Sequence, residues 1–148
     1  MIKGSLKTSM GILVAASAAV SMLHAQAGKA IASHDGSCQV TVPGDWQQEL
    51  SFGVANSPDK SVHLAVSSPK FSPTLAEVEQ TAPSLYPNDK IVKQTPTEFQ
   101  MEGMGGDGKP NVYRGIQIPG KVCLVEVNYA SGTIDDARKI AESLKAAH

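Results

Sequence analysis

Two cysteines, Cys38 and Cys123, are the residues of this 148-residue chain whose chemistry follows most directly from their number and placement. In an exported protein an even pair is first interpreted as a disulfide, and closing a loop of about 85 residues would stabilise the fold by about 4 kcal/mol in the chain-entropy description. Two buried thiols acting as small apolar residues are the alternative. The pair lacks the spacing of a redox C-x-x-C motif, and no nearby histidine completes a zinc site. We therefore expect neither a metal site nor a cofactor.

A glycine-rich segment, residues 103–108, matches the spacing G-x-G-x-x-G. In dinucleotide-binding proteins a helix begins directly after these glycines, so that backbone N–H groups meet the phosphates. Here Lys109-Pro110 and an alternating apolar segment follow instead, which indicates a mobile hairpin loop. Gly105, Gly106 and Asp107 in this loop are candidate contact residues for a partner.

Catalytic motifs are weak in this chain. Two S-x-x-K matches occur, at 57–60 and 67–70, but the first lies in a predicted turn, the second contains Pro69, and the partner motifs of penicillin-recognising enzymes are absent. His63 is predicted on the solvent-facing side of a strand, where no spacing supplies the partners of a catalytic triad or a metal site. We predict no catalytic residue.

Four glutamates and one tryptophan are further candidates for contact with a partner. The glutamates at 77 and 79, and those at 98 and 102, are spaced so that pairs share one face of a helix or strand. Paired carboxylates do acid–base work only when they are buried and close together, so solvated faces, or an acidic surface for a basic partner, are expected. Trp46 either anchors a partner or covers one end of the core.

The first 27 residues have the pattern of a secretory signal peptide. Lys3 and Lys7 precede an uncharged run of 14 residues, Met10–Leu23, and Ala25-Gln26-Ala27 offers a small-x-small cleavage site. We expect cleavage after Ala27, with cleavage after Ala25 as the alternative. A retained membrane anchor is the competing interpretation, although the run is short of the roughly 20 apolar residues of a spanning helix. The protein is expected to be exported, to the periplasm or outside the cell.

The remaining residues, 28–148, are expected to form one domain. The leader holds two of the 13 Lys and Arg residues and none of the 14 Asp and Glu residues, so the other 121 residues carry a formal charge of −3. Their lysines are spread singly, which makes nucleic acid an unexpected partner. No second apolar run follows the leader, so no membrane span is expected in the mature chain.

Apolar periodicity predicts several strands, one internal helix and a closing helix. Residues 28–36 show no period and are interpreted as a flexible lead-in to a domain at 37–148. The first helix, from Thr74 to about residue 82, should end or kink at Pro83. The closing helix should begin after Thr133 as N-cap and carry an apolar stripe to Leu144. Strands are predicted at 38–42, 50–54, 62–66, 90–102, 112–118 and 123–129.

The stretch Val40-Thr41-Val42-Pro43-Gly44-Asp45-Trp46 and the order of elements through residue 144 resemble the PsbP-like fold. That fold is shared by the extrinsic subunit of the photosynthetic oxygen-evolving complex, a yeast nuclear-import factor and many small bacterial exported proteins. The resemblance covers nearly the whole mature domain and implies an α+β fold, an antiparallel sheet of about six strands with two helices packed on it. Members are typically accessory or binding proteins, and they share no active site that could be carried over.

We therefore expect a non-catalytic accessory or binding protein of the cell envelope, with a protein partner. The alternative is a small exported hydrolase or ligand-binding protein with a pocket between the sheet and the C-terminal helix, in which His63 or a glutamate is the chemical group. A deep pocket that places His63 beside a carboxylate or a serine would favour the alternative.

Overall fold

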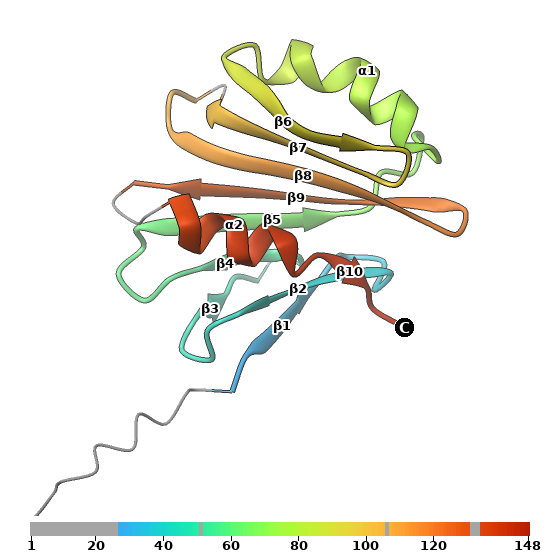
Figure 1. Cartoon of the computed structure of the whole chain (residues 1–148). Coiled ribbons are helices and arrows are strands. Elements are labelled where there is room, and N and C mark those ends of the chain that lie inside the picture. The colour runs from blue at the N-terminus through green and yellow to red at the C-terminus, as the bar shows by residue number, and fades with distance from the viewer. Residues whose placement is uncertain (1–26, 51, 106, 131–133) are drawn as a thin grey trace, which may run out of the picture.

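Two antiparallel sheets and two helices form the fold, in a computed structural model that describes residues 27–50, 52–105, 107–130 and 134–148 (Figure 1). The larger sheet has seven strands in the order β3-β4-β5-β9-β8-β7-β6, and the smaller has three in the order β1-β2-β10. The α+β class with antiparallel strands and two helices is confirmed: the larger sheet has seven strands where about six were predicted, and a second sheet of three strands accompanies it. Apart from Ala27, the predicted signal peptide lies outside the described residues.

The strands are β1 (Lys29–Ala32), β2 (Cys38–Val42), β3 (Gln47–Gln48), β4 (Val54–Asn56), β5 (Val62–Ser67), β6 (Asp89–Thr95), β7 (Glu98–Met104), β8 (Pro110–Ile118), β9 (Lys121–Tyr129) and β10 (Lys145–Ala146), and the helices are α1 (Leu75–Leu85) and α2 (Ile134–Glu142).

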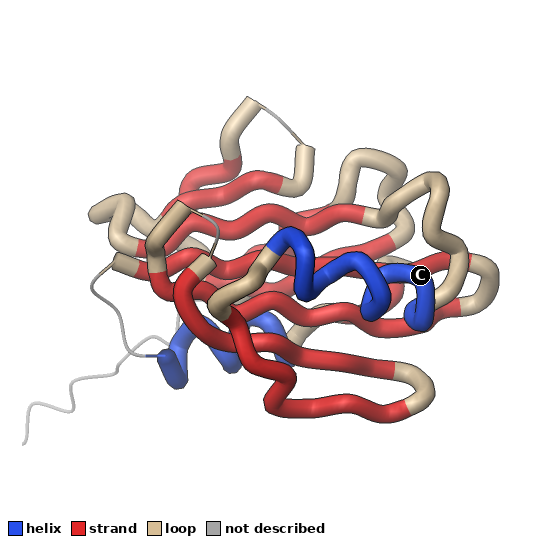
Figure 2. Tube along the Cα trace, turned by 90° about the horizontal axis from the view of Figure 1, so that it is seen from above, coloured by secondary structure: helices blue, strands red, loops and turns tan. Residues whose placement is uncertain are grey.

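The larger sheet is apolar on both faces. In β9, Val125 and Val127 pack into one cluster of buried residues, while Val122 and Leu124 pack into another. Since successive side chains of a strand point to opposite faces, these two clusters lie on opposite sides of the sheet. The helix α1 covers one face of the large sheet, and α2 together with the smaller sheet covers the other face (Figure 2).

The helix α1 begins where the sequence predicts it. Thr74 is the N-cap, and a capping box joins it to Glu77 through the Thr74 side chain and the Glu77 carboxylate. The predicted end at residue 82 is wrong, because the helix continues through Pro83 to Leu85. Pro83 lies in the last turn, where only one intrahelical bond is lost, and Tyr86 N still donates to Ala82 O at 2.9 Å.

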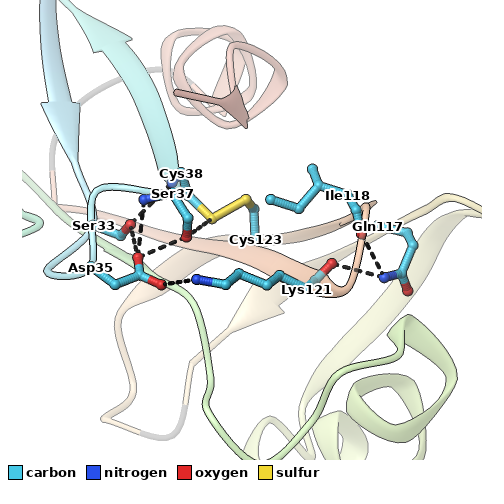
Figure 3. Close-up of a disulfide and its surroundings, with 8 residues drawn as sticks. All are labelled: Ser33, Asp35, Ser37, Cys38, Gln117, Ile118, Lys121 and Cys123. Carbon is cyan, nitrogen blue, oxygen red and sulfur yellow. Dashed lines mark hydrogen bonds and ion pairs between the residues drawn. A yellow bond between two sulfur atoms is a disulfide. The ribbon is translucent and has the colours of Figure 1, made fainter. Parts of the chain in front are cut away.

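A disulfide joins the two sheets. Cys38 of β2 and Cys123 of β9 are bonded, with Cα atoms 5.6 Å apart, as the sequence predicted (Figure 3). Beside the disulfide, Lys121 Nζ donates to Asp35 Oδ2 at 2.9 Å, and this ammonium group holds the pKa of Asp35 well below its usual range. The small sheet is therefore fixed to the large one by a covalent bond and a neighbouring ion pair.

Both ends of the described chain add strands that the sequence pattern did not reveal. Residues 28–36, interpreted as a flexible lead-in, contain β1, which pairs with β2 over four residues. Ile31 is the one large apolar residue of β1 and is fully buried, so no alternation signals the strand. At the other end β10 pairs with the opposite edge of β2, which makes β2 the central strand of the small sheet.

Two predicted strands have different bounds. Leu50 and Phe52 are exposed, and β4 begins only at Val54, after Gly53 with its positive φ of 80°. The predicted strand 90–102 is a hairpin of β6 and β7 that turns at Pro96-Thr97, which agrees with the expected break at Pro96. No helix in the described ranges has the length and apolar character needed to cross a membrane.

Candidate functional site

An open groove of about 860 Å³ lies between α2 and the small sheet. Gly28 and three longer segments line it: residues 41–46 of β2 and the following turn, residues 57–62 of the β4–β5 turn, and one side of α2 between Asp136 and Ser143. We call it the α2 groove. Its position matches the pocket between sheet and C-terminal helix that the alternative interpretation of the sequence required.

One side of the helix α2 is buried in the core, and a neighbouring side carries polar side chains that line the groove. Ala137 and Ala141 are buried in the core, whereas Asp136 and Lys139 are exposed and line the groove. At the end of the helix the Ser143 hydroxyl accepts a hydrogen bond from the backbone N–H of Thr41 at 2.8 Å. This bond fixes the helix end to β2 and closes one side of the groove.

The β4–β5 turn forms the opposite side and carries a fixed carboxylate. Asp59 Oδ1 accepts hydrogen bonds from the Ser57 hydroxyl, the Ser61 hydroxyl and the Ser61 N–H at 2.7, 2.7 and 3.0 Å. These donors, with the Ser57 hydroxyl first, lower the pKa of Asp59 to about 2. Asp59 is therefore an anion at neutral pH, held in place at the edge of the groove.

Trp46 forms part of the groove floor. Its side chain is 6% exposed and belongs to the core cluster beneath α2. Of the two interpretations of Trp46, the structure favours the one in which it covers an end of the core. It does not project into solvent as a contact residue, although its edge lines the groove.

The charges around the groove are mainly negative. Asp45, Asp59, Asp136 and Lys139 line it, and Lys29 Nζ lies beside it, donating to Trp46 O at 3.2 Å. The apolar lining residues are Val42, Pro43, Trp46, Pro58, Val62 and Ile140. Within the described ranges, no group of three or more His, Cys, Asp or Glu side chains is placed to hold a metal ion. The arrangement can bind an apolar, positively charged segment through burial and charge attraction.

The glycine-rich segment lies at a different place. Gly105 N donates to Lys109 O at 2.7 Å and Gly108 N to Gly105 O at 2.9 Å, and the strand β8 follows directly. Gly103 and Met104 are the end of β7 and pair with β8, so the predicted hairpin loop begins only at Gly105, and β8 rather than a helix follows it. Gly105 is buried and Asp107 is exposed, while Gly106 lies outside the described residues.

His63 lies beside a smaller hollow of about 430 Å³, which we call the His63 pocket. Its Nδ1 is 2.8 Å from Oδ1 of Asn56, and among the hydrogen bonds of the described residues none joins His63 to a hydroxyl or a carboxylate. Ser61 and Asp107 also line this pocket, but among the described residues neither is hydrogen-bonded to the imidazole, so His63 activates no nucleophile here.

The four glutamates have structural partners rather than one another. Glu77 caps α1, and Glu79 accepts a hydrogen bond from Gln94 at 3.1 Å. Glu98 pairs with Lys93 and with the buried Arg114, and these contacts lower its pKa, Lys93 most. Glu102 pairs with Arg138 of α2, which lowers the pKa of Glu102. No pair of these carboxylates forms an acid–base site.

Sequence reasoning named Trp46 of the groove as a candidate contact residue but missed the carboxylates. Asp45, Asp59 and Asp136 are far apart in the chain, and each has a local explanation as a turn residue or a residue of the first helical turn. The S-x-x-K match at 57–60 lies in a tight turn, as predicted: Lys60 N donates to Ser57 O, while the Ser57 hydroxyl is bonded to Asp59. No local signal could have brought these side chains together.

No protein-family model and no curated protein sequence matches the chain. Among solved structures, the chain is similar to the solution structure of cyanobacterial PsbP (CyanoP) from Synechocystis sp. PCC 6803. The two are 12% identical, the match covers 82% of this chain and 93% of that chain, and the TM-score is 0.48. The likeness to a PsbP-like fold, expected from the sequence, is a likeness of fold alone.

Proposed function

We propose that this protein is a non-catalytic binding protein exported to the cell envelope, and that its α2 groove receives a short segment of a protein partner. The segment carries apolar side chains and at least one lysine or arginine. The observation that carries the proposal is the combination, in one groove, of an apolar floor with carboxylates at its edges.

Charge complementarity selects this occupant. Three carboxylates line the groove, against the ammonium group of Lys139 in the lining and that of Lys29, which donates to Trp46 O at 3.2 Å. This small negative excess among the side chains favours a cationic segment over an acidic one. Asp45 and Asp136 are exposed in the unbound protein, and Asp59 is fixed as an anion by its serine partners. Among the apolar lining residues, Pro43 and Pro58 are exposed, and they provide apolar area whose burial favours association.

The leader pattern and the disulfide support export. A disulfide persists where the compartment is oxidising, which is the case outside the cytoplasm. The leader has the charged start, apolar centre and small-residue site of a secretory signal. Both features support the proposal that the protein is exported and acts in the cell envelope.

Trp46 provides a direct test, because it is the single tryptophan of the chain and lines the groove. Its fluorescence is measured while two ten-residue peptides are added, one with leucine alternating with lysine and one with leucine alternating with glutamate. We expect the lysine peptide to change the emission in a saturable way and the glutamate peptide to have no effect.

The double variant Asp45→Asn/Asp136→Asn should bind the lysine peptide several-fold more weakly. Asp135→Asn is the matched control, since Asp135 lies next to Asp136 on α2 but does not line the groove. Equal binding of both peptides, or an equal loss in the control variant, would contradict the proposal.

A further inference from the structure

The His63 pocket lies on the face of the large sheet that carries α1, away from the α2 groove. On β5, Val62 and Leu64 point into the core beneath α2, so His63 between them points to the other face. His63 is paired in register with Asn128 of β9 and with Asn56 of β4. Three polar side chains therefore form one row across three adjacent strands, and this row is the floor of the pocket.

A chain of hydrogen bonds orients the imidazole of His63. Asn56 Nδ2 donates to Glu49 Oε1 at 2.5 Å, so the other amide atom of Asn56, Oδ1, is the acceptor that faces His63. His63 Nδ1 consequently carries the proton and donates to Asn56 at 2.8 Å. In the neutral ring Nε2 is left with its lone pair, so His63 offers a hydrogen-bond acceptor to a ligand.

Two turns, far apart in sequence, form the walls and bring two ammonium groups. Lys60 belongs to the β4–β5 turn, where its φ of 57° and its N–H bond to Ser57 O fix the backbone. Lys109 ends the β7–β8 loop, where its N–H donates to Asp107 Oδ1 at 3.0 Å. Both lysines line the pocket, and their backbones are held in place before any ligand binds.

The charge of these lysines is only partly compensated. Lys109 Nζ is 3.9 Å from Asp107 Oδ2, a distance at the outer limit of an ion pair. Lys60 forms no ion pair in the part of the chain that the structure describes. The walls therefore favour an anionic group, whereas the lone pair of His63 Nε2 requires a hydrogen-bond donor on the same ligand.

We infer that the His63 pocket binds a small hydroxylated carboxylic acid, with its carboxylate between Lys60 and Lys109 and a hydroxyl group donating to His63 Nε2. The volume of about 430 Å³ is at the small end of the range of roughly 300–1,000 Å³ typical of ligand pockets. This site lies on the other side of the β4–β5 turn from the α2 groove, with Ser61 in the lining of both, and its ligand is a small molecule and not a protein segment.

Gluconate, acetate and sorbitol are the probes, because gluconate combines the carboxylate of acetate with the hydroxyl groups of sorbitol. The imidazole signals of His63 are followed by NMR during titration with each compound, and a His63→Gln variant assigns them. We expect gluconate to shift these signals with an affinity at least five-fold higher than that of either acetate or sorbitol.

Lys60→Gln should weaken gluconate binding at least five-fold. Lys145→Gln is the matched control, since Lys145 is exposed on β10 of the other sheet and should leave binding unchanged. The inference is overturned if gluconate binds no better than acetate and sorbitol, or if Lys60→Gln binds gluconate as the control does. Gluconate should leave the fluorescence of Trp46 unchanged. The gluconate test and the peptide test can therefore fail independently of each other.

Discussion

Arg138 of α2 and Glu102 of β7 face each other in two parallel hydrogen bonds, Nε to Oε1 and Nη2 to Oε2, both 2.7 Å long. A bidentate pair of this kind fixes the relative orientation of the two side chains as well as their separation, because both donors of the planar guanidinium group meet both oxygens of the carboxylate. Asp136 and Lys139, next to Arg138 on the helix, line the α2 groove. The pair therefore helps to set the position of the helix that forms one groove wall.

The pair predicts a dependence of stability on pH. Hydrogen bonding from Arg138 lowers the pKa of Glu102, so the contribution is present above about pH 4.3, the ordinary pKa of glutamate, and is lost as pH falls through the lowered value. Glu102→Gln should therefore be less stable than the parent protein at pH 7, and the difference should shrink toward pH 3. Urea unfolding at pH 7, 5 and 3 measures it.

Glu142→Gln serves as control for that experiment, because Glu142 is an exposed glutamate of the same helix. It should change the unfolding midpoint little at any pH. A Glu102→Gln variant as stable as the parent at pH 7 would show that the Arg138–Glu102 pair contributes nothing to the free energy of unfolding.

Removing the disulfide should lower the free energy of unfolding by about 2–5 kcal/mol. The double variant Cys38→Ala/Cys123→Ala loses the one covalent bond between β2 and β9, which closes a loop with a sequence separation of 85. Urea denaturation with and without reductant checks the expectation, since reductant should weaken the parent protein and leave the variant unchanged. A loss below about 1 kcal/mol would mean that packing alone holds the two sheets together.

Gly115→Ala should destabilise the protein by about 1–3 kcal/mol through overpacking. Gly115 is paired in register with Phe99, and a Cβ at this position would overlap the Phe99 ring and lie 3.1 Å from Leu124 Cδ2. Thermal unfolding of the single and double variants tests the cause. The penalty of Gly115→Ala should be smaller in a Phe99→Leu background, and an equal penalty in both backgrounds would argue against the ring as its source.

Thr74→Ala should cost about 1 kcal/mol, because it removes the capping box at the start of α1. Thr81→Ala is the comparison, since Thr81 is an exposed threonine within the same helix whose hydroxyl only donates to helix carbonyls. Chemical denaturation of both variants should show a loss for Thr74 alone. Similar losses in both would indicate that the cap has no special role.

Several strands of the two sheets could be predicted from local sequence. Strands β2, β5, β8 and β9 were predicted close to their observed bounds, because their apolar residues alternate and turn-forming residues delimit them. The start of α1 followed from Thr74 and Glu77, whose interaction spans only three residues. In each case the determining contacts lie within one element or one turn.

Elements that depend on a distant partner could not be predicted in this way. In β1 and β10 little local pattern exists, and both strands form because the two edges of β2 offer hydrogen bonds to them. Leu50 and Phe52 alternate like a strand yet are exposed, since nothing in their own sequence shows that the strand paired with β5 starts only at Val54. Pairing, and not periodicity, set these boundaries.

The sequence alone determined an α+β chain with a signal-peptide pattern and a disulfide between Cys38 and Cys123, because composition, period and cysteine number are local or countable properties. Only the tertiary structure decided which side chains meet. The α2 groove takes its carboxylates from residues 45, 59 and 136, and the His63 pocket takes its lysines from residues 60 and 109. Contacts between residues so far apart are set by strand order and helix packing, which no single stretch of sequence encodes.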